Sequence, residues 1–289
     1  MLNGIAARLP ATRHRDFRAL WGGTTCSSIS LWTLLLGNAW IVFKLSDSSF
    51  WVGVSTFASM SPFLLAPFGG VVADRFERRL LVRLTRLGAL ATTLSLLALA
   101  GFNLIEVWMV VAVAFVQGVV RAVEIPADQA LLANVVPPED LANAVSLSTM
   151  TQQGSRAAGP LLSGPLLASI GVEGAYAIAA LFALLALTSM SRVRTSSRGG
   201  ITRVGQVVRN LGQGLSYIRG HRPVALLFAL VAAHCALTMS FDAMLPGFAE
   251  TELREPAGGF TLITFGVGIG ALGGTFVLAV FAGGFDGRL

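Results

Sequence analysis

Four polar side chains at the end of the apolar run Val107–Ile125 are the strongest chemical feature of the sequence. Gln117, Arg121, Glu124 and Asp128 are spaced i, i+4, i+7 and i+11, so they share one face of a helix. Arg121 and Glu124 are close enough to pair. Glu124 could bind a proton, because an apolar environment disfavours the charged carboxylate. The alternative is a structural ion pair that only fixes helix packing.

The run Leu141–Ile170 contains a second polar face. Thr149, Gln152 and Arg156 are spaced i, i+3 and i+7, which predicts that they line one side of a helix. A guanidinium in the middle of an apolar run is costly and is expected to face a polar space or another charge. We expect Arg156 to face a cavity, where it would bind an anionic substrate or pair with Glu124.

Three further polar side chains occupy apolar runs without forming a motif. Asn38 lies between Trp32 and Trp40 and is a candidate for substrate contact. His234 is near the middle of its run and could titrate near neutral pH, although a lone histidine in a helix more often packs or hydrogen bonds. Asp242 is nearer the end of the same run, where it either lines a cavity or lies at the membrane interface.

Other chemistries lack the residues they need. The sequence has no glycine-rich nucleotide loop, no metal-ligand spacing of Cys and His, and no clustered Ser, His and Asp. We therefore predict no enzyme, no cofactor and no metal site. Cys26 and Cys235 fall in apolar runs, which favours small buried side chains over a disulfide. The net charge of +6 could suit nucleic acid, but the arginines cluster between apolar runs, which argues against it.

The composition indicates the elements that carry these residues. Of the 289 residues, 54% are hydrophobic and only 12% are charged, against about 25% charged in a soluble domain. Lipid must therefore replace the missing polar surface. A helix needs roughly 20 apolar residues to cross a bilayer. Eight runs reach or nearly reach this length: Ala19–Phe43, Phe50–Val72, Leu80–Phe102, Val107–Ile125, Leu141–Ile170, Ala175–Met190, Pro223–Phe248 and Phe260–Ala282.

The basic residues alternate between the connections. Arginines cluster in the N-terminal tail, after the second run and after the sixth, whereas the opposite connections hold few. Because basic connections stay in the cytoplasm, we predict a multi-pass membrane protein with both termini cytoplasmic. Arginine far outnumbers lysine, of which Lys44 is the single example, and this composition is typical of a GC-rich bacterial genome. The expected location is thus the bacterial cytoplasmic membrane.

One long polar segment interrupts the apolar runs. Within it, apolar residues recur at i, i+3, i+4, i+7, i+11 and i+14 from Val204, which predicts an amphipathic helix with a basic opposite face. Such a helix lies in the membrane interface. We therefore divide the chain into an N-terminal six-helix bundle (residues 1–190), a cytoplasmic linker (191–222) and a partial C-terminal bundle (223–289).

The connection after the second run, Gly69–Arg79, carries a family resemblance. It reads Gly-Gly-Val-Val-Ala-Asp-Arg-Phe-Glu-Arg-Arg and resembles the signature loop of the major facilitator superfamily, Gly-x-x-x-Asp-Arg-x-Gly-Arg-Arg. Glu77 stands where the family usually has glycine. The resemblance implies an all-α integral membrane bundle with two six-helix halves. This chain would cover the first half and two helices of the second, either as part of a longer protein or as the product of a truncated gene.

The same resemblance implies roles for particular residues in the loop. Asp74, Arg75 and Arg78 would form a gating charge cluster with Asp128, and the cluster would hold the outward-open state. Gly70, next to Gly69, would allow neighbouring helices to approach closely.

The fifth run carries a second resemblance. Gly159-Pro160-Leu-Leu-Ser-Gly164 is similar to the Gly-Pro-x-x-Gly-Gly motif in helix five of superfamily antiporters, which are mainly exporters. Serine replaces two of the usual glycines, at Ser155 and Ser163. The alternative is ordinary packing of small residues between helices. The segment from Pro126 to Ala144 also resembles the siderophore- and drug-exporter branch.

Together these features predict a secondary active transporter that exports small molecules, with the proton as coupling ion and alternating access as mechanism. A lipid or lysolipid translocator, an importer of the same fold, and a non-transporting truncated membrane protein are the alternatives. The expected partners are the lipid bilayer, a small-molecule substrate and the proton.

Overall fold

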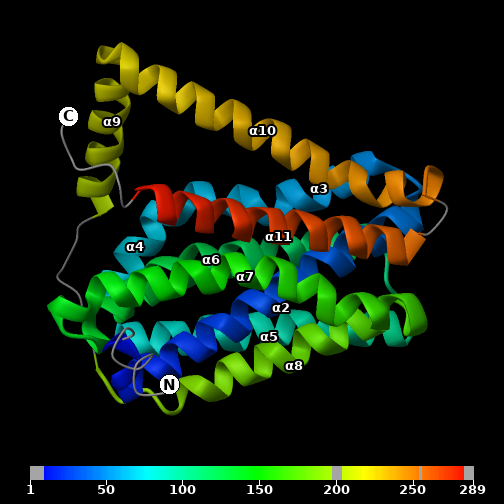
Figure 1. The fold of residues 1–289 in the computed structure, drawn as a ribbon, viewed down its shortest axis with the longest axis horizontal. Coiled ribbons are helices and arrows are strands. Elements are labelled where there is room, and N and C mark those ends of the chain that lie inside the picture. The colour runs from blue at the N-terminus through cyan, green and yellow to red at the C-terminus, as the bar shows by residue number, and fades with distance from the viewer. Residues whose placement is uncertain (1–9, 197–203, 254–255, 283–289) are drawn as a thin grey trace.

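We analysed a computed structural model, which describes residues 10–196, 204–253 and 256–282; some side chains of the last three helices also lie outside the description. All regular elements in these ranges are helices, and most run side by side in a bundle (Figure 1). They are η1 (Pro10–Arg13), α2 (Arg15–Ser46), α3 (Ser49–Met60), η2 (Ser61–Leu65), α4 (Ala66–Arg75), α5 (Arg78–Gly101), α6 (Val107–Val135), α7 (Pro138–Ile170), α8 (Val172–Met190), α9 (Val204–Gly220), α10 (Arg222–Thr251) and α11 (Pro256–Ala282).

The predicted all-helical membrane bundle is confirmed. Each of the eight apolar runs corresponds to a long helical segment, with α3, η2 and α4 together forming the second. Five segments among the described residues are long and apolar enough to cross a membrane: Arg15–Ser46, Ser49–Arg75, Arg78–Gly101, Val107–Val135 and Val172–Met190. The first half of the chain therefore supplies most of the membrane-spanning surface.

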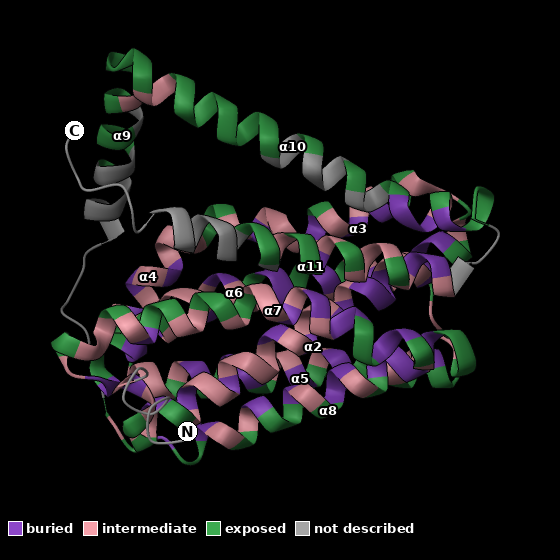
Figure 2. Ribbon diagram, viewed as in Figure 1, coloured by how far each residue is buried: buried purple, intermediate pink, exposed green. Residues whose placement is uncertain are grey.

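Helix α2 is the centre of the bundle. It packs against α8, α7 and α6, while α5 packs against α8 and α6 on the far side. Helix α3 contacts α6, and the two last helices attach from outside, α11 along α7 and α10 along α3. Much of α10 between Arg222 and Met244 is exposed, and its contact with the bundle is near its C-terminal end (Figure 2).

Helix α6 extends past the apolar run that ends at Ile125 and continues through Pro126 to Val135, so that it includes Asp128 as its predicted face requires. Proline has no N–H, so the carbonyl of Ala122, four residues earlier, loses its helical hydrogen bond. Gly69 of α4 packs directly on this carbonyl, and a Cβ on Gly69 would collide with it. The neighbouring Gly70 has open space around it. Gly69, rather than Gly70, thus allows the close approach of α4 and α6.

Gly159 and Gly164, the two glycines of the motif in the fifth apolar run, also lie where helices contact each other. A Cβ on Gly159 would lie 2.8 Å from Cβ of Trp32 and 2.9 Å from the backbone nitrogen of Thr33 on α2. A Cβ on Gly164 would collide with the side chain of Thr261 on α11. Pro160 between them is buried. The small residues of α7 thus fit two neighbours on opposite sides.

The apolar core consists of two clusters with a polar layer between them. One cluster gathers near the end of the bundle that contains Leu34 and Tyr176, and the other near the end that contains Phe17 and Met190. On α2 the polar layer falls between Leu20 and Leu34, which belong to different clusters. The layer therefore lies at mid-depth in the bundle, where polar groups must find partners within the protein.

The start of α2 is fastened to the connection that follows α8. Asp16 accepts hydrogen bonds from the backbone nitrogens of Arg194 and Thr195 at 2.9 and 2.7 Å, and from the Thr195 hydroxyl at 2.6 Å. His14 contacts Asp140 at the start of α7, at 2.7 Å. The first and last elements of the six-helix bundle are thereby held together at one end.

Candidate functional site

A buried arginine organises the polar layer. The side chain of Arg86 on α5 is only 1% exposed and lies between two carboxylates of α6. Its Nη2 is 3.3 Å from Oδ1 of Asp128, and its Nε is 3.6 Å from Oε1 of Glu124. Nη1 donates to the Ala186 carbonyl of α8 at 3.1 Å. One guanidinium thus connects α5, α6 and α8.

Hydroxyl groups of α2 complete the surroundings of the two carboxylates. Thr24 donates to Oδ2 of Asp128 at 2.7 Å and accepts from Arg86 Nη2 at 3.1 Å, while Ser27 donates to Oε1 of Glu124 at 3.1 Å. Gly23 makes room for this arrangement, because a Cβ there would collide with Arg86 Nη1. We call the five side chains Thr24, Ser27, Arg86, Glu124 and Asp128 the charge cluster.

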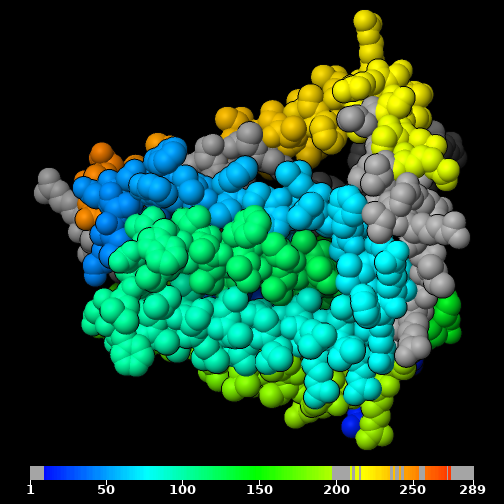
Figure 3. Space-filling view, turned by 180° about the vertical axis from the view of Figure 1, so that it is seen from behind, coloured from blue at the N-terminus to red at the C-terminus, as the bar shows by residue number. Residues whose placement is uncertain are grey.

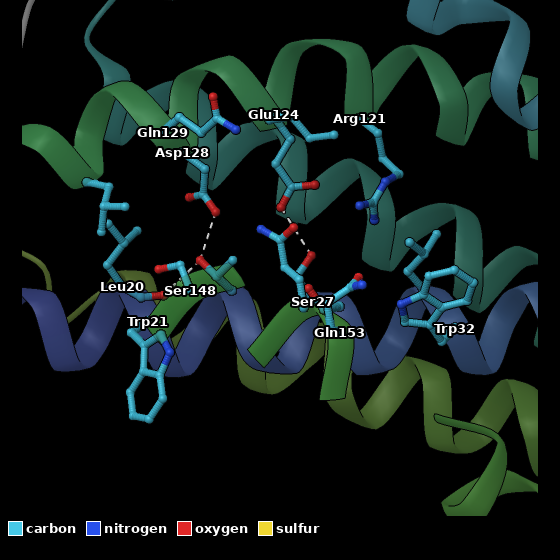
Figure 4. A pocket seen from close by; sticks show the side chains of 16 residues that line it. Leu20, Trp21, Ser27, Trp32, Arg121, Glu124, Asp128, Gln129, Ser148 and Gln153 are labelled. Atoms are coloured by element: carbon cyan, nitrogen blue, oxygen red, sulfur yellow. Dashed lines mark hydrogen bonds between the residues drawn. The ribbon is translucent and has the colours of Figure 1, made fainter. Parts of the chain in front are cut away.

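A cavity of about 190 Å³ opens beside the charge cluster, between α2, α6 and α7. Figure 4 shows Asp128 and Glu124 reaching toward α2, with Arg121 further along α6 and two tryptophans of α2 at the sides. The wall mixes aromatic, amide, hydroxyl and charged groups. Its lining comprises Leu20, Trp21, Thr24, Ser27, Ser28, Leu31, Trp32, Arg121, Glu124, Ile125, Asp128, Gln129, Leu132, Ser148, Gln152 and Gln153.

The structure places the four residues of the α6 face together, as their spacing predicts. Gln117 is 9% exposed, donates to the Thr92 hydroxyl at 3.2 Å and lines a second, smaller cavity with Arg121 and Glu124. Glu124 forms its ion pair with Arg86 rather than with Arg121. The side chain of Arg121 remains in the cavity wall, within electrostatic range of Glu124 and Asp128.

The polar face predicted on α7 is only partly in the cavity. Gln152 lines it, whereas Thr149 is exposed and donates to the Val145 carbonyl of its own helix at 3.0 Å. The guanidinium of Arg156 lies 4.9 Å from the centre of the Trp32 ring, in a cation–π contact. Trp32 itself lines the cavity, so Arg156 contacts a residue of the cavity wall.

The loop motif and Asp128 are separated in this structure. Arg78 is paired with Asp74 at 3.4 Å and donates to the Ala130 carbonyl of α6 at 3.4 Å. Arg75 is exposed. Asp128 belongs instead to the charge cluster around Arg86. The loop therefore reaches α6 two residues beyond Asp128, through the Ala130 carbonyl.

Three other predicted residues lie away from the charge cluster. Asn38 is 4% exposed and its side-chain oxygen accepts a hydrogen bond from Tyr176 at 2.9 Å, within the apolar cluster shared by α2 and α8. His234 is exposed on α10. The side chain of Asp242 lies outside the described residues. No group of His, Cys, Asp and Glu that could hold a metal ion occurs among the described residues.

The central residue, Arg86, is missing from the sequence-based candidates. Its position seven residues after Arg79 suggests a continuation of the basic connection before α5, and two arginines of that series, Arg75 and Arg83, are indeed exposed. The available signal was its place inside the apolar run Leu80–Phe102, since a charge within a span is a functional candidate.

The fold and the site define a class of protein: a helical membrane bundle with a charged cavity between its inner helices, as in secondary transporters. The family model described as "transmembrane secretion effector" matches residues 6–286. The chain belongs to this family of the major facilitator superfamily.

Curated relatives of the chain are transport proteins. It is 26% identical over 242 residues to macrolide efflux protein A of Streptococcus pyogenes, a match that covers 80% of this chain and 58% of the relative. It is 29% identical over 179 residues to an enterobactin exporter of Citrobacter koseri (58% and 40% covered). A third match is the staphyloferrin A transporter of Staphylococcus aureus, at 27% over 139 residues (47% and 35% covered). The chain thus spans between 35% and 58% of the length of these relatives.

Solved structures confirm the fold. A bacterial homologue of the human lysosomal transporter Spinster, in an inward-facing and unoccupied conformation, superposes with a TM-score of 0.61 at 18% identity, over 95% of this chain and 64% of that one. A peptide transporter superposes with a TM-score of 0.55 at 13% identity, over 82% and 49%. Both similarities concern the arrangement of the helices.

Proposed function

We propose that this chain forms the first bundle and the start of the second bundle of a proton-coupled exporter of small molecules. The observation that carries the proposal is the charge cluster, in which two carboxylates and one arginine lie at mid-depth beside a cavity. Transport would proceed by alternating access between residues 1–190 and the bundle that begins at residue 223, joined by the linker 191–222. Both termini of the chain would face the cytoplasm.

The charge balance of the cluster supports proton coupling. Glu124 and Asp128 share Arg86, and the second nearby cation, Arg121, forms no direct bond to either carboxylate among the described residues. A bound proton removes one negative charge from the carboxylates and weakens the hold of Arg86 on α6. Because Arg86 also binds α8 and contacts Thr24 of α2, protonation would loosen contacts among four helices.

The cavity wall suggests what a substrate must offer. Trp21 and Trp32 provide apolar faces, while Gln152, Gln153 and Arg121 provide amide and cationic groups. A substrate of mixed character, with apolar surface and several hydrogen-bonding groups, suits this lining. Relatives of the chain are named for macrolides and for the siderophores enterobactin and staphyloferrin A. These compounds are therefore the first to test.

The ion pair between Asp74 and Arg78 would hold α4 against α6 during part of the transport cycle. In this structure Arg78 is held by Asp74 and reaches the Ala130 carbonyl, so it ties the end of α4 to α6. We assign the gating role to this pair together with Asp128, whose link to the loop runs along α6 rather than through a direct ion pair. Arg75, which is exposed, would meet its partner only in another state of the cycle.

The test uses inside-out vesicles from bacteria that express the complete reading frame containing this chain. With a pH gradient imposed and followed by a fluorescent dye, addition of erythromycin, enterobactin or staphyloferrin A should partly collapse the gradient for the transported compound. Glu124→Gln should reduce this response at least tenfold, because the variant side chain cannot exchange a proton. Arg83→Gln, an exposed change on α5, is the control and should respond like wild type. A full response in Glu124→Gln would contradict the assignment of Glu124.

A further inference from the structure

A second cavity, of about 30 Å³, adjoins the main one. Helices α2, α5, α6 and α8 form its wall, which contains Ser27, Ser30, Leu31, Leu34, Arg86, Ala89, Thr93, Gln117, Arg121, Glu124, Ala183 and Ala186. Seven of these residues are polar. A polar space of this size holds about one water molecule. Glu124 is one of four residues that line both cavities, with Ser27, Leu31 and Arg121.

Some hydrogen-bonding groups of this wall have partners within the protein and others do not. The Nε atom of Arg86 is buried and has no hydrogen-bond acceptor among the described residues. The hydroxyl hydrogens of Ser27, Ser30 and Thr93 are already donated, to Glu124 at 3.1 Å, to the Ala179 carbonyl at 2.7 Å and to the Ala89 carbonyl at 2.8 Å. Oε1 of Glu124 is 3.6 Å from Arg86 Nε, beyond hydrogen-bond distance. The wall thus offers this buried donor, the guanidinium of Arg121 and several free acceptor lone pairs.

A ligand that fits this wall must accept the hydrogen bond of Arg86 Nε and donate to the free lone pairs. Water can do both, and it satisfies a buried N–H that would otherwise destabilise the fold. A small anion would meet the Glu124 carboxylate, and a metal cation would meet two arginines. The chemistry of the wall therefore selects water over either ion.

We propose that the small cavity is a water site that bridges Arg86 Nε and Glu124 and forms the first station of a proton path toward Gln117. This inference rests on the proposed proton-coupled function and deepens it. Gln117 lies seven residues before Glu124 on α6, about 10 Å along the helix axis. Its amide nitrogen is bound to the Thr92 hydroxyl, so its oxygen can accept from a water.

Both cavities contact Glu124, so a proton and a substrate can reach the same carboxylate. A proton arrives on the water as hydronium and passes to a carboxylate oxygen of Glu124. A neutral water and a neutral acid remain, and no redox change occurs. The substrate occupies the main cavity, where it meets Glu124 either charged or protonated.

The test fills the small cavity without altering any charge. Ala183→Val on α8 adds two methyl groups to its wall, and Ala89→Val does the same from α5. The matched control is Ala180→Val, a buried α8 position that lines neither cavity. Infrared difference spectra of the purified protein between pH 5 and pH 9 are recorded in H₂¹⁶O and H₂¹⁸O, so that bound water shows as an isotope-sensitive O–H band.

Wild type and Ala180→Val should share one such band that Ala183→Val and Ala89→Val lack. If either filled variant fails to give a monodisperse protein, the other still decides the question. Retention of every isotope-sensitive band in a folded filled variant would overturn the water site. In the vesicle assay, the filled variants should lose at least tenfold in gradient collapse. If a filled variant loses the infrared band but keeps its full gradient response, the water site stands and its role in the proton path is overturned.

The two proposals fail in different ways. If wild type shows no substrate-dependent gradient collapse, the proton-coupled function is wrong, whatever the spectra show. If wild type couples and the filled variants couple equally well, only the path through the small cavity is wrong.

Discussion

At the scale of single residues, the site depends on one guanidinium. Arg86 offsets the charge of Glu124 and Asp128 and hydrogen bonds to α8, and it is 1% exposed. Without Arg86, the two carboxylates would be buried with only hydroxyl partners and with Arg121, which forms no ion pair with either of them among the described residues. Removal of one member of a buried ion pair leaves an uncompensated charge, which is far more costly than removal of a surface charge.

We therefore expect Arg86→Ala to lower the free energy of unfolding by about 3–5 kcal/mol. Arg83→Ala, at an exposed position one turn earlier on α5, should change it by less than about 0.5 kcal/mol. Thermal unfolding of both variants in detergent measures the difference. The double change Arg86→Met with Asp128→Asn should recover part of the loss, because it removes a negative charge together with the positive one. Equal midpoints for Arg86→Ala and Arg83→Ala would show that the ion pairs do not stabilise the bundle.

The sequence predicted the candidate residues whose positions follow from local periodicity. The shared face of Gln117, Arg121, Glu124 and Asp128 follows from helix geometry alone, and the structure places all four in the walls of the two cavities. The partners of these residues could not be predicted, because Arg86 is 42 residues from Asp128 in the chain and reaches it only after α5 and α6 pack. The same applies to Asn38, whose partner Tyr176 is 138 residues away.

At the scale of elements, Pro126 and Gly69 form a matched pair. The proline frees the Ala122 carbonyl, and the glycine lets the backbone of α4 approach that oxygen. A short Cα–H to carbonyl contact recurs where helices come this close. The apolar run ends at Ile125, but the helix continues through Pro126 to Val135, so the apolar pattern alone underestimates its length.

Gly69→Ala should destabilise the protein by about 1–3 kcal/mol, because the added Cβ collides with a backbone oxygen that cannot move alone. Gly70→Ala is the matched control, with open space around the added Cβ. This change should be neutral or stabilising by up to about 1 kcal/mol, since alanine favours the helix. The measurement is the unfolding midpoint of each variant in the same detergent. A larger loss for Gly70→Ala than for Gly69→Ala would contradict the packing of α4 on α6.

At the scale of the whole molecule, the bundle is layered along its length. The apolar cluster around Phe17 and Met190 closes one end, the cluster around Leu34 and Tyr176 closes the other, and the charge cluster and both cavities lie between them. Overall hydropathy predicted the helices but not these layers, because each layer combines residues of several helices that are far apart in the sequence.

The predicted orientation of the chain in the membrane can be tested with single cysteines in a variant that lacks Cys26 and Cys235. Asn103→Cys, between α5 and α6, and Glu252→Cys, after α10, should be labelled by a membrane-impermeant maleimide in intact cells, because both positions are exposed and predicted to face outward. Ser191→Cys, exposed after α8, should be labelled only after the membrane is permeabilised. Labelling of Ser191→Cys and Glu252→Cys from the same side would contradict the topology.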